Sequence, residues 1–307
     1  MRVAHCSDLH LLSHDGARWL DLANKRWIGA MNLLSNRSRH YHVAAFEQMV
    51  EDINAQGIDH VLCTGDVTNL ALEQEFQFAR VRFDKLAGGP NEVTVIPGNH
   101  DAYVAEGIAH FAQIFDAYHR SDVGWQWQDT ERDGDDDDLR WPVVRIRGDL
   151  ALIGVTTSRA TPWFTAYGRV GAGQLARLRR ALFDERLRGK VRLVAIHHPP
   201  AGKRAESTIR GLRDHAAFAA VIAEAGAELI VHGHEHRDMT ESLAGPHGQA
   251  VPVRGVPSGT YEHNKPDRTA RYRIYELDGG AVVSDQVRVW NREASCFDAR
   301  SGTEQHS

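Results

Sequence analysis

Five short motifs along the chain carry carboxylate, amide and imidazole side chains, which are the groups that bind divalent metal ions in catalytic sites. Oxygen and imidazole ligands without thiolates suit manganese, iron, cobalt or zinc, and they disfavour a structural zinc. One such motif alone would be weak support, because short combinations of these residues are common. Together the five motifs predict a site for two metal ions. In chain order they are Asp8-Leu9-His10, Gly65-Asp66, Gly98-Asn99-His100-Asp101, His197-His198-Pro199 and His232-Gly233-His234-Glu235-His236.

The spacing of the candidate ligands suggests how they divide between the two ions. Two ions about 3.5–4 Å apart need one ligand that spans both, and Asp66, on a tight turn after Gly65, is the natural bridge. Residues two apart at a strand end can face the same way, which groups Asp8 with His10. The expected ligands of the first ion, besides Asp66, are Asp8, His10 and His236. Those of the second ion are Asn99, His197 and His234.

In this order the motifs resemble those of the calcineurin-like metallophosphoesterase superfamily, which carries D-x-H, G-D, G-N-H-D/E, H-x-P and G-H-x-H. The match runs from Asp8 to His236, and every motif position is filled. The resemblance implies an α/β fold, a four-layer α/β/β/α sandwich of two mixed sheets with the dimetal site at strand ends. It implies phosphoester hydrolysis, with a hydroxide that bridges the two ions attacking phosphorus. It also implies that His197 is a ligand and that His198 supports the ligands or the substrate instead.

His100 and Asp101 are the expected catalytic residues. His100 follows the ligand Asn99 but is not needed as a ligand itself, so it can hydrogen-bond a phosphoryl oxygen or protonate the leaving oxygen. Asp101 is expected to fix the tautomer of His100. The pattern leaves open whether His100 is a general acid or only stabilises charge.

Three functions remain open from the sequence. The Gly-Asn-His-Asp and His-His-Pro-Pro runs are most similar to the bacterial branch of class III cyclic nucleotide phosphodiesterases and glycerophosphodiesterases, which implies a phosphodiesterase acting on a small molecule. A pyrophosphohydrolase of the UDP-diacylglucosamine type would use the Trp-rich helix predicted over Trp19–Ser35, with the basic stretch up to His40, to hold a lipid-tailed substrate. A non-catalytic binding module on the same metal site is the alternative from a different class.

The motifs need strands that end at one edge of a sheet, and each motif follows an apolar run that predicts a buried strand. Open α/β folds build their sites where strand ends release the chain into loops. The five runs are Arg2–Cys6, His60–Thr64, Glu92–Ile96, Val191–Ile196 and Glu228–Val231. Helices between strands are typical of a mostly parallel sheet with covering helices. The predicted helices are His42–Ala55, Leu72–Leu86, Gly173–Leu187 and Leu212–Ala225.

The last third of the chain changes to short strands, for which we expect antiparallel hairpins. The predicted strands there are Val251–Val253, Arg271–Glu276 and Val282–Val289. No internal repeat and no Pro/Gly/Ser-rich linker divides the chain, so we predict one metallophosphoesterase domain over residues 1–290. Residues 291–307 carry no pattern and are predicted to be a loose tail. The last strands could form the edge of a homo-oligomer, although nothing in the sequence requires one.

The composition is that of an ordinary globular protein of 307 residues, with 42% apolar and 25% charged residues. A net charge of −5 supplies no basic field for a nucleic acid polymer. The 3 cysteines are widely spaced, which predicts a reducing compartment and no disulfide framework. The N-terminus does not resemble a signal peptide, and no run approaches the ~20 apolar residues of a membrane span. We therefore expect a cytoplasmic protein.

Four further residues are candidates for contact with the substrate. Trp163 and Tyr167 lie in a loop-like stretch before a helix, where aromatic side chains either stack on a base or pack the loop itself. His263 and Arg268 follow the last metal motif and would reach a bound phosphate, but only their place in the sequence supports this.

Overall fold

The structure of the chain is a computed structural model that describes residues 1–11, 43–128, 138–262 and 265–299. The predicted helix Trp19–Ser35, the basic stretch up to His40 and the candidate substrate residue His263 lie outside these ranges. Within the described ranges, no helix is long and apolar enough to cross a membrane.

The first third of the chain and its C-terminal end together build a six-stranded mixed sheet with the strand order β12-β11-β10-β1-β2-β3. β1, β2 and β3 are parallel, whereas β10 joins β1 in the antiparallel sense. The hairpin predicted for the last strands is confirmed, because β11 pairs antiparallel with β10. The strands are β1 (Arg2–Cys6), β2 (His60–Cys63), β3 (Val93–Val95), β10 (Arg271–Asp278), β11 (Ala281–Asn291) and β12 (Cys296–Ala299).

The middle of the chain builds a second six-stranded sheet, with the order β4-β5-β6-β7-β9-β8. Its centre is parallel from β5 to β9, and antiparallel strands close both edges. β9 was expected in a hairpin, and it forms one with β8, but it also pairs in parallel with β7. The strands are β4 (Val143–Arg147), β5 (Leu150–Gly154), β6 (Val191–Ala195), β7 (Leu229–His232), β8 (Met239–Ala244) and β9 (Ala250–Gly255).

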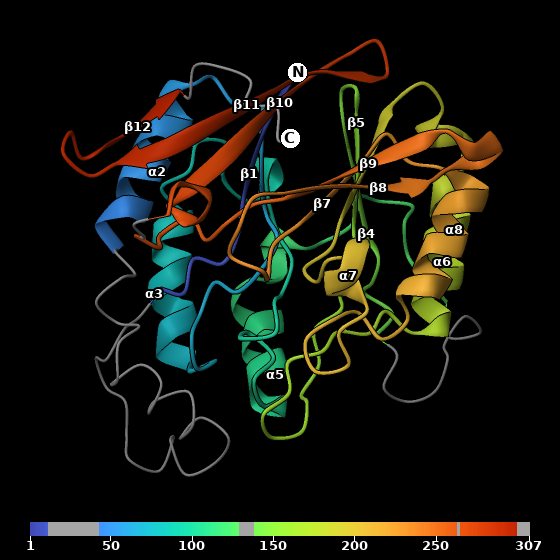
Figure 1. Cartoon of the computed structure of the whole chain (residues 1–307), viewed down its shortest axis with the longest axis horizontal. Helices are drawn as coiled ribbons and strands as arrows, with labels where there is room; N and C mark the ends of the chain where they lie inside the picture. The colour runs from blue at the N-terminus through green and yellow to red at the C-terminus, as the bar shows by residue number, and fades with distance from the viewer. Residues whose placement is uncertain (12–42, 129–137, 263–264, 300–307) are drawn as a thin grey trace.

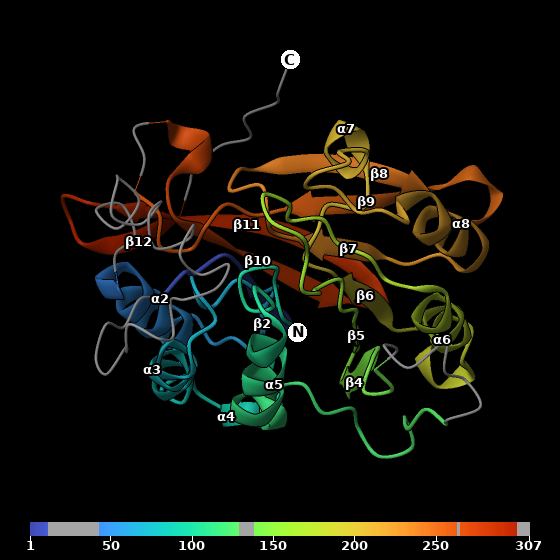
Figure 2. The same cartoon turned by 90° about the horizontal axis from the view of Figure 1, so that it is seen from below.

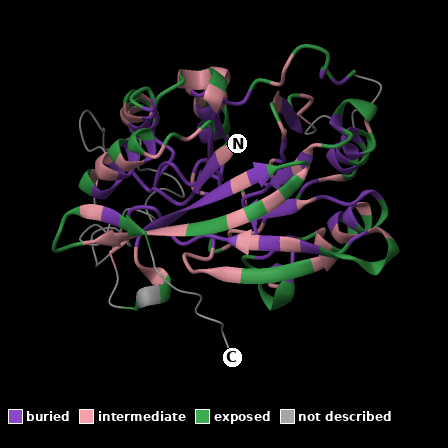
Figure 3. Cartoon of the chain, turned by 90° about the horizontal axis from the view of Figure 1, so that it is seen from above, coloured by how far each residue is buried: buried purple, intermediate pink, exposed green. Residues whose placement is uncertain are grey.

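Helices cover the outer faces of both sheets, which gives the four-layer α/β/β/α arrangement that the resemblance implied (Figures 1 and 2). Buried residues follow the strands and the inner faces of the helices, as the purple segments of Figure 3 show. One apolar cluster joins Val3 of the first sheet to Leu193 of the second. The helices over the first sheet are α2 (Val43–Ala55), α3 (Glu73–Phe83), α4 (Gly89–Glu92) and α5 (Ala105–Ile114). Those on the side of the second sheet are α6 (Ala172–Leu182), α7 (Gly202–Ala205) and α8 (His215–Ala225).

The prediction of a loose tail over residues 291–307 is wrong for its first part. Residues 296–299 form β12, which pairs with β11 and buries Phe297 against Tyr272 and Trp290, with ring centroids 5.5 and 5.4 Å apart. A strand of four residues is too short to show a readable alternation, so its position depends on the ladder to β11. Residues 300–307 lie outside the described ranges.

Burial of His119 makes the fold sensitive to acid. Its ring stacks on Trp141 with the centroids 5.5 Å apart, and its Nδ1 lies 2.8 Å from the carbonyl oxygen of Phe115. Burial, followed by the positive charge of Arg140, lowers the pKa of His119 to about 4. Because the unfolded chain takes up this proton near pH 6.5, the contribution of His119 to stability is lost as the pH falls from about 6.5 to about 4.

The variant His119→Phe keeps a stacking ring but cannot take up the proton. In the metal-free protein we expect its free energy of unfolding to fall less than that of the wild type between pH 6.5 and pH 4.5, by about 2 kcal/mol. Urea unfolding at the two pH values measures this difference. Equal losses in the two proteins would show that His119 does not titrate in this way.

Candidate metal centre

All five predicted motifs lie directly after the carboxyl ends of parallel strands, namely β1, β2 and β3 in the first sheet and β6 and β7 in the second. Two close approaches between loops join the motifs. A Cβ atom at Gly98 would overlap the Asp66 side chain, and a Cβ atom at Gly233 would overlap Ser7 and Asp8. These two glycines therefore allow loops from different strands to touch.

The ligand-bearing loops do not have the extended backbone that the two-residue spacing suggested. Five of the candidate ligands have φ in the left-handed region, which costs a non-glycine residue of order 1 kcal/mol or more and is concentrated at functional sites. The left-handed backbone at these positions, and not the pleat of a strand, therefore sets the direction of side chains that are two residues apart. The residues are Asp8 (52°), His10 (45°), Asp66 (52°), His234 (72°) and His236 (50°).

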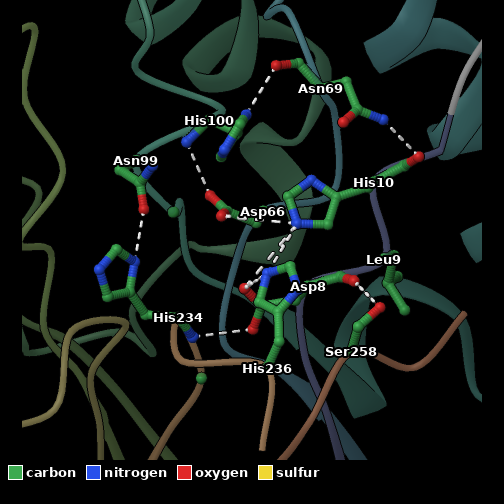
Figure 4. Close-up of polar contacts among 12 residues, drawn as sticks. Asp8, Leu9, His10, Asp66, Asn69, Asn99, His100, His234, His236 and Ser258 are labelled. Atoms are coloured by element: carbon green, nitrogen blue, oxygen red, sulfur yellow. Dashed lines mark hydrogen bonds and ion pairs between the residues drawn. The ribbon is translucent and has the colours of Figure 1, made fainter. Parts of the chain in front are cut away.

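The first predicted ligand set comes together as one compact group. Asp8, His10, Asp66 and His236 each place one potential ligand atom within 4.8 Å of the others. The Nε2 atom of His236 lies 3.1 Å from both Asp8 Oδ1 and His10 Nε2 (Figure 4). His10 Nε2 is also 3.9 Å from Asp66 Oδ2.

The second predicted set forms a neighbouring group, which shares Asp66 with the first. Asp66, His197 and His234 also lie within 4.8 Å of one another in their potential ligand atoms. Asn99 Oδ1 is 3.0 Å from His197 Nε2 and 2.7 Å from His234 Nδ1. The Oδ2 atom of Asp66 faces His197 Nε2 at 3.5 Å, while its Oδ1 accepts a hydrogen bond from the backbone N–H of His100 at 2.7 Å. One oxygen of Asp66 thus faces both groups.

The donor atoms of the second group fit a cation. His197 Nδ1 donates to the carbonyl oxygen of Thr64 at 2.7 Å, and His234 Nε2 donates to that of Arg210 at 2.9 Å. In each neutral ring the other nitrogen therefore carries a lone pair, and both lone pairs point at the Asn99 oxygen. Acceptors that face one another without a hydrogen between them are what a bound metal ion stabilises.

Burial and neighbouring charges also favour cation binding. Burial, followed by the negative charge of Asp8, raises the pKa of Asp66 well above its usual range. Burial acts to raise the pKa of Asp8 too, but His236 overrides it and holds this pKa well below the usual range. Burial lowers the pKa of His197 and His234, so these imidazoles stay neutral and able to donate a lone pair. Cations would relieve the repulsion between the two buried carboxylates.

His100 lies beside the first group, and a backbone carbonyl sets its tautomer. Its Nδ1 lies 2.8 Å from the carbonyl oxygen of Asn69, whose side chain in turn donates to the carbonyl oxygen of His10 at 2.6 Å (Figure 4). The His100 and His10 rings meet edge to face with centroids 4.8 Å apart. The hydrogen on Nδ1 is thus fixed, and Nε2 is the nitrogen that gains or loses a proton.

The prediction that Asp101 orients His100 is wrong. The Asp101 carboxylate accepts hydrogen bonds from three backbone N–H groups, those of Val67, Thr68 and Gly98, and from the Thr68 hydroxyl, at 2.9–3.2 Å. Burial raises the pKa of Asp101 to about 6, even though these hydrogen bonds act to lower it. Through these hydrogen bonds, Asp101 holds together the turn that carries Asp66 and the turn that carries Asn99.

The variant Asp101→Asn tests whether Asp101 holds the two turns together. An amide nitrogen would face backbone donors, so we expect the metal-free protein to lose about 2–3 kcal/mol of stability in urea unfolding. Asp278→Asn, at an exposed position at the end of β10, is the control and should change stability by less than about 0.5 kcal/mol. A stability equal to that of the wild type would contradict the role.

His198 stands outside both groups, because its two ring nitrogens are occupied elsewhere. Nδ1 lies 2.7 Å from the hydroxyl of Thr157, and Nε2 lies 3.0 Å from the carbonyl oxygen of Ala166. Its ring is fully buried beside His234, with the centroids 4.4 Å apart. His198 therefore packs against the candidate ligand His234 and positions the loop that contains Ala166.

The remaining substrate candidates are placed differently from one another. Trp163 is exposed, whereas the Tyr167 ring is covered by the guanidinium of Arg213 at 4.0 Å. Arg268 ends a 3-10 turn over Pro266–Arg268, and no hydrogen bond or ion pair among the described residues joins it to the two groups.

Two features of the site were not anticipated from the sequence. The segment after β9 holds the first loop in place. The Ser258 hydroxyl donates to the Asp8 carbonyl oxygen at 2.5 Å (Figure 4). The Thr260 hydroxyl donates to the carbonyl oxygen of Leu9 at 2.6 Å. Arg210 also lies beside the site, because its carbonyl oxygen accepts the hydrogen bond from His234 Nε2. A basic residue in an irregular loop gives no periodic signal, and hydroxyls that bond backbone carbonyls leave none in the sequence.

Comparison with known proteins agrees with this fold. A family model of the calcineurin-like phosphoesterases matches residues 1–238, which is more than half of the chain. The chain therefore belongs to the calcineurin-like phosphoesterase family. Its described residues include two groups of side chains that could hold metal ions. No curated protein sequence is detectably similar to it.

Several solved structures share the fold at low sequence identity. A dimetal phosphatase from Danio rerio is 12% identical, with 94% of each chain covered and a TM-score of 0.56. The purple acid phosphatase PPD1 from yellow lupin (Lupinus luteus) is 10% identical and has a TM-score of 0.56; 97% of this chain and 52% of that one are covered. The sulfate thiohydrolase SoxB from Thermus thermophilus is 16% identical and has a TM-score of 0.52; 97% of this chain and 58% of that one are covered. The chain thus spans little more than half of the last two proteins.

Proposed function

We propose that the chain hydrolyses small-molecule phosphodiesters with the help of two divalent metal ions, manganese, iron, zinc or cobalt. The observation that carries the proposal is the single Asp66 oxygen that faces both groups of ligand atoms. The proposed ligands of one ion are Asp8, His10, Asp66 and His236. Those of the other are Asp66, Asn99, His197 and His234.

Two bound ions would supply Lewis acidity and lower the pKa of a water molecule, so that water attacks phosphorus at neutral pH. The chain's own residues hold and orient the reactants. The backbone N–H of His100 fixes the Asp66 carboxylate, and the His100 ring is held against His10. In the reaction, a water oxygen bonds to phosphorus while the bond from phosphorus to the leaving alcohol oxygen breaks. We propose that His100 gives its Nε2 proton to that oxygen and is protonated again from solvent.

The proposed preference for diesters rests on two features. The Gly-Asn-His-Asp and His-His-Pro-Pro runs resemble those of the phosphodiesterase branch. An alkoxide leaving group, as in most natural diesters, needs a proton donor, and His100 adjoins the first group of ligand atoms. The lipid pyrophosphohydrolase alternative depends on residues 19–40, which lie outside the described ranges. No contact among the described residues favours it.

Hydrolysis of bis(p-nitrophenyl) phosphate and of p-nitrophenyl phosphate tests the proposal. After chelation and addition of manganese, we expect metal-dependent turnover that is faster on the diester. Faster turnover of the monoester would contradict the diester preference. Stoichiometric metal without turnover of these or natural diesters would favour the binding module.

A further inference from the structure

Two loops beside the ligand atoms pair with each other. They are residues 158–170, between β5 and α6, and residues 206–213, between α7 and α8 (Figure 1). The N–H of Ala166 donates to the carbonyl oxygen of Ile209 at 2.9 Å, and the N–H of Gly168 donates to that of Gly211 at 3.0 Å. Arg213 N–H returns a bond of 2.9 Å to Gly168. The two loops therefore form one structural unit.

Two histidines of the metal motifs hold this unit in place. His198 Nε2 lies 3.0 Å from the carbonyl oxygen of Ala166 in the first loop. His234 Nε2 donates at 2.9 Å to the carbonyl oxygen of Arg210 in the second. Each loop is therefore bonded to a side chain in or next to the second group. Whatever these loops expose lies at the edge of the proposed catalytic site.

The loops expose large apolar side chains where they meet. A turn closed by the N–H of Thr165 and the carbonyl oxygen of Pro162, 3.2 Å apart, presents Trp163 and Phe164, which are 55% and 79% exposed. Phe164 also has a φ of 64°, a strained conformation for an aromatic residue. Ile209, 55% exposed, lies on the paired loop. Exposed apolar residues that are gathered beside a site mark a binding surface.

Arg210 adds a positive charge to this surface. Its side chain is exposed and forms no ion pair with any residue that the structure describes. Its backbone lies beside the site, because the carbonyl oxygen of Arg210 accepts the hydrogen bond from His234 Nε2 at 2.9 Å. Arg210 therefore lies close enough to attract a phosphate anion at the metal centre.

We propose that Trp163, Phe164, Ile209 and Arg210 form a recognition rim for nucleoside phosphodiesters. The aromatic pair stacks on the base, and the Arg210 guanidinium pairs with an anionic oxygen of the phosphate. This inference rests on the proposed phosphodiesterase function and names its substrate class. The rim would bind the nucleoside that remains on phosphorus, whereas His100 would donate a proton to the alcohol that leaves.

The size and surroundings of the rim favour a base over an acyl chain. Its apolar part consists of three side chains, and the polar residues Ser207, Thr208 and Arg210 adjoin them. A base needs one aromatic face and polar partners for its edge, and stacking on one aromatic side chain typically changes binding about tenfold. An acyl chain would leave most of its length in water on so small a surface.

Two substrates with the same leaving group and charge test the proposal. Thymidine 5′-(p-nitrophenyl phosphate) carries a nucleoside where methyl p-nitrophenyl phosphate carries a methyl group. We expect the wild type to prefer the thymidine ester in kcat/KM by about tenfold or more. Trp163→Ala should remove most of this preference and leave the methyl ester unaffected. Arg210→Ala keeps the carbonyl that His234 bonds, and it should slow both esters equally, by about ten- to a hundredfold.

Two exposed residues far from the rim supply matched controls. Phe183→Ala, at the C-terminal end of α6, removes an exposed aromatic ring, and Arg188→Ala, three residues before β6, removes an exposed charge. Neither should change the activity on either ester. Calorimetry gives a readout apart from turnover. Trp163→Ala should weaken the binding of thymidine 5′-monophosphate by about tenfold and leave that of inorganic phosphate unchanged.

Three results would contradict the proposal that the rim recognises a nucleoside. One is a thymidine preference that survives Trp163→Ala, and another is an equal loss of activity on both esters in Trp163→Ala. The third is faster hydrolysis of hexadecyl p-nitrophenyl phosphate than of the thymidine ester, which would assign the surface to a lipid. Failure of the phosphodiesterase function looks different, because the metal-loaded wild type would then hydrolyse no diester. In that case the binding measurement still decides whether the rim recognises a nucleotide.

Discussion

The variant Asp66→Asn is expected to lower kcat/KM for bis(p-nitrophenyl) phosphate by about a thousandfold or more. The substitution keeps the shape of the side chain, and its carbonyl oxygen can still accept the hydrogen bond from the N–H of His100. It replaces the oxygen that faces both groups with an amide NH2, which repels a cation. Because both groups use that atom, we expect the content of both metal ions to fall, as measured by elemental analysis after dialysis.

The stability of metal-free Asp66→Asn separates this effect from misfolding. The pKa of Asp66 is raised by burial, so the folded wild type loses stability as the pH rises from about 4 through that raised value. Asparagine has no such dependence. Above this window, metal-free Asp66→Asn should therefore be at least as stable as the metal-free wild type in urea. A variant that is inactive and also less stable at pH 8 would contradict the interpretation.

The second large effect is expected for His100→Ala, and it should depend on the leaving group. General acid catalysis contributes about 10²–10⁴-fold when the leaving oxygen needs a proton. A diester with an alkyl leaving group should therefore lose about that much in kcat. The p-nitrophenolate ion leaves readily without a proton, so p-nitrophenyl esters should lose tenfold or less. Steady-state kinetics on a matched pair of diesters measures the difference.

His100→Ala leaves the proposed metal ligands intact, because residue 100 bonds Asp66 through its backbone N–H. The metal content should thus equal that of the wild type, which is the control for this variant. An equal loss on alkyl and p-nitrophenyl esters would show that His100 stabilises charge without donating a proton. The kinetics would then settle the alternative that the sequence leaves open.

The elements that position the site were predictable because their core-facing residues repeat clearly. The continuous apolar runs before Asp8, Asp66 and His197 predicted β1, β2 and β6 to within one residue. α5 was not predicted, although its apolar residues have helical spacing; only Gly107 and Phe111 of the helix are buried. β8 was missed as well, because it is an edge strand without a buried residue and therefore lacks alternation.

The candidate site was predictable in its residue types but not in its supporting contacts. The two sets of ligand candidates come together as their chemistry suggested. The partner of His100 was not predictable, because Asn69 bonds it through a backbone carbonyl, which every residue has. Asp101 looked like the partner only because it is adjacent in the chain. Arg210 was missed for a related reason, since its proximity depends on the path of an irregular loop.

Each ligand group joins residues from both halves of the sandwich. In the first group, His236 follows β7 of the second sheet, whereas its companions follow β1 and β2 of the first. In the second group, Asp66 and Asn99 follow strands of the first sheet, and His197 and His234 follow strands of the second. A bound ion therefore ties the two sheets together, and neither half can unfold without releasing it. Metal loading should thus slow unfolding, so that the site would contribute to the kinetic stability of the fold as well as to the proposed catalysis.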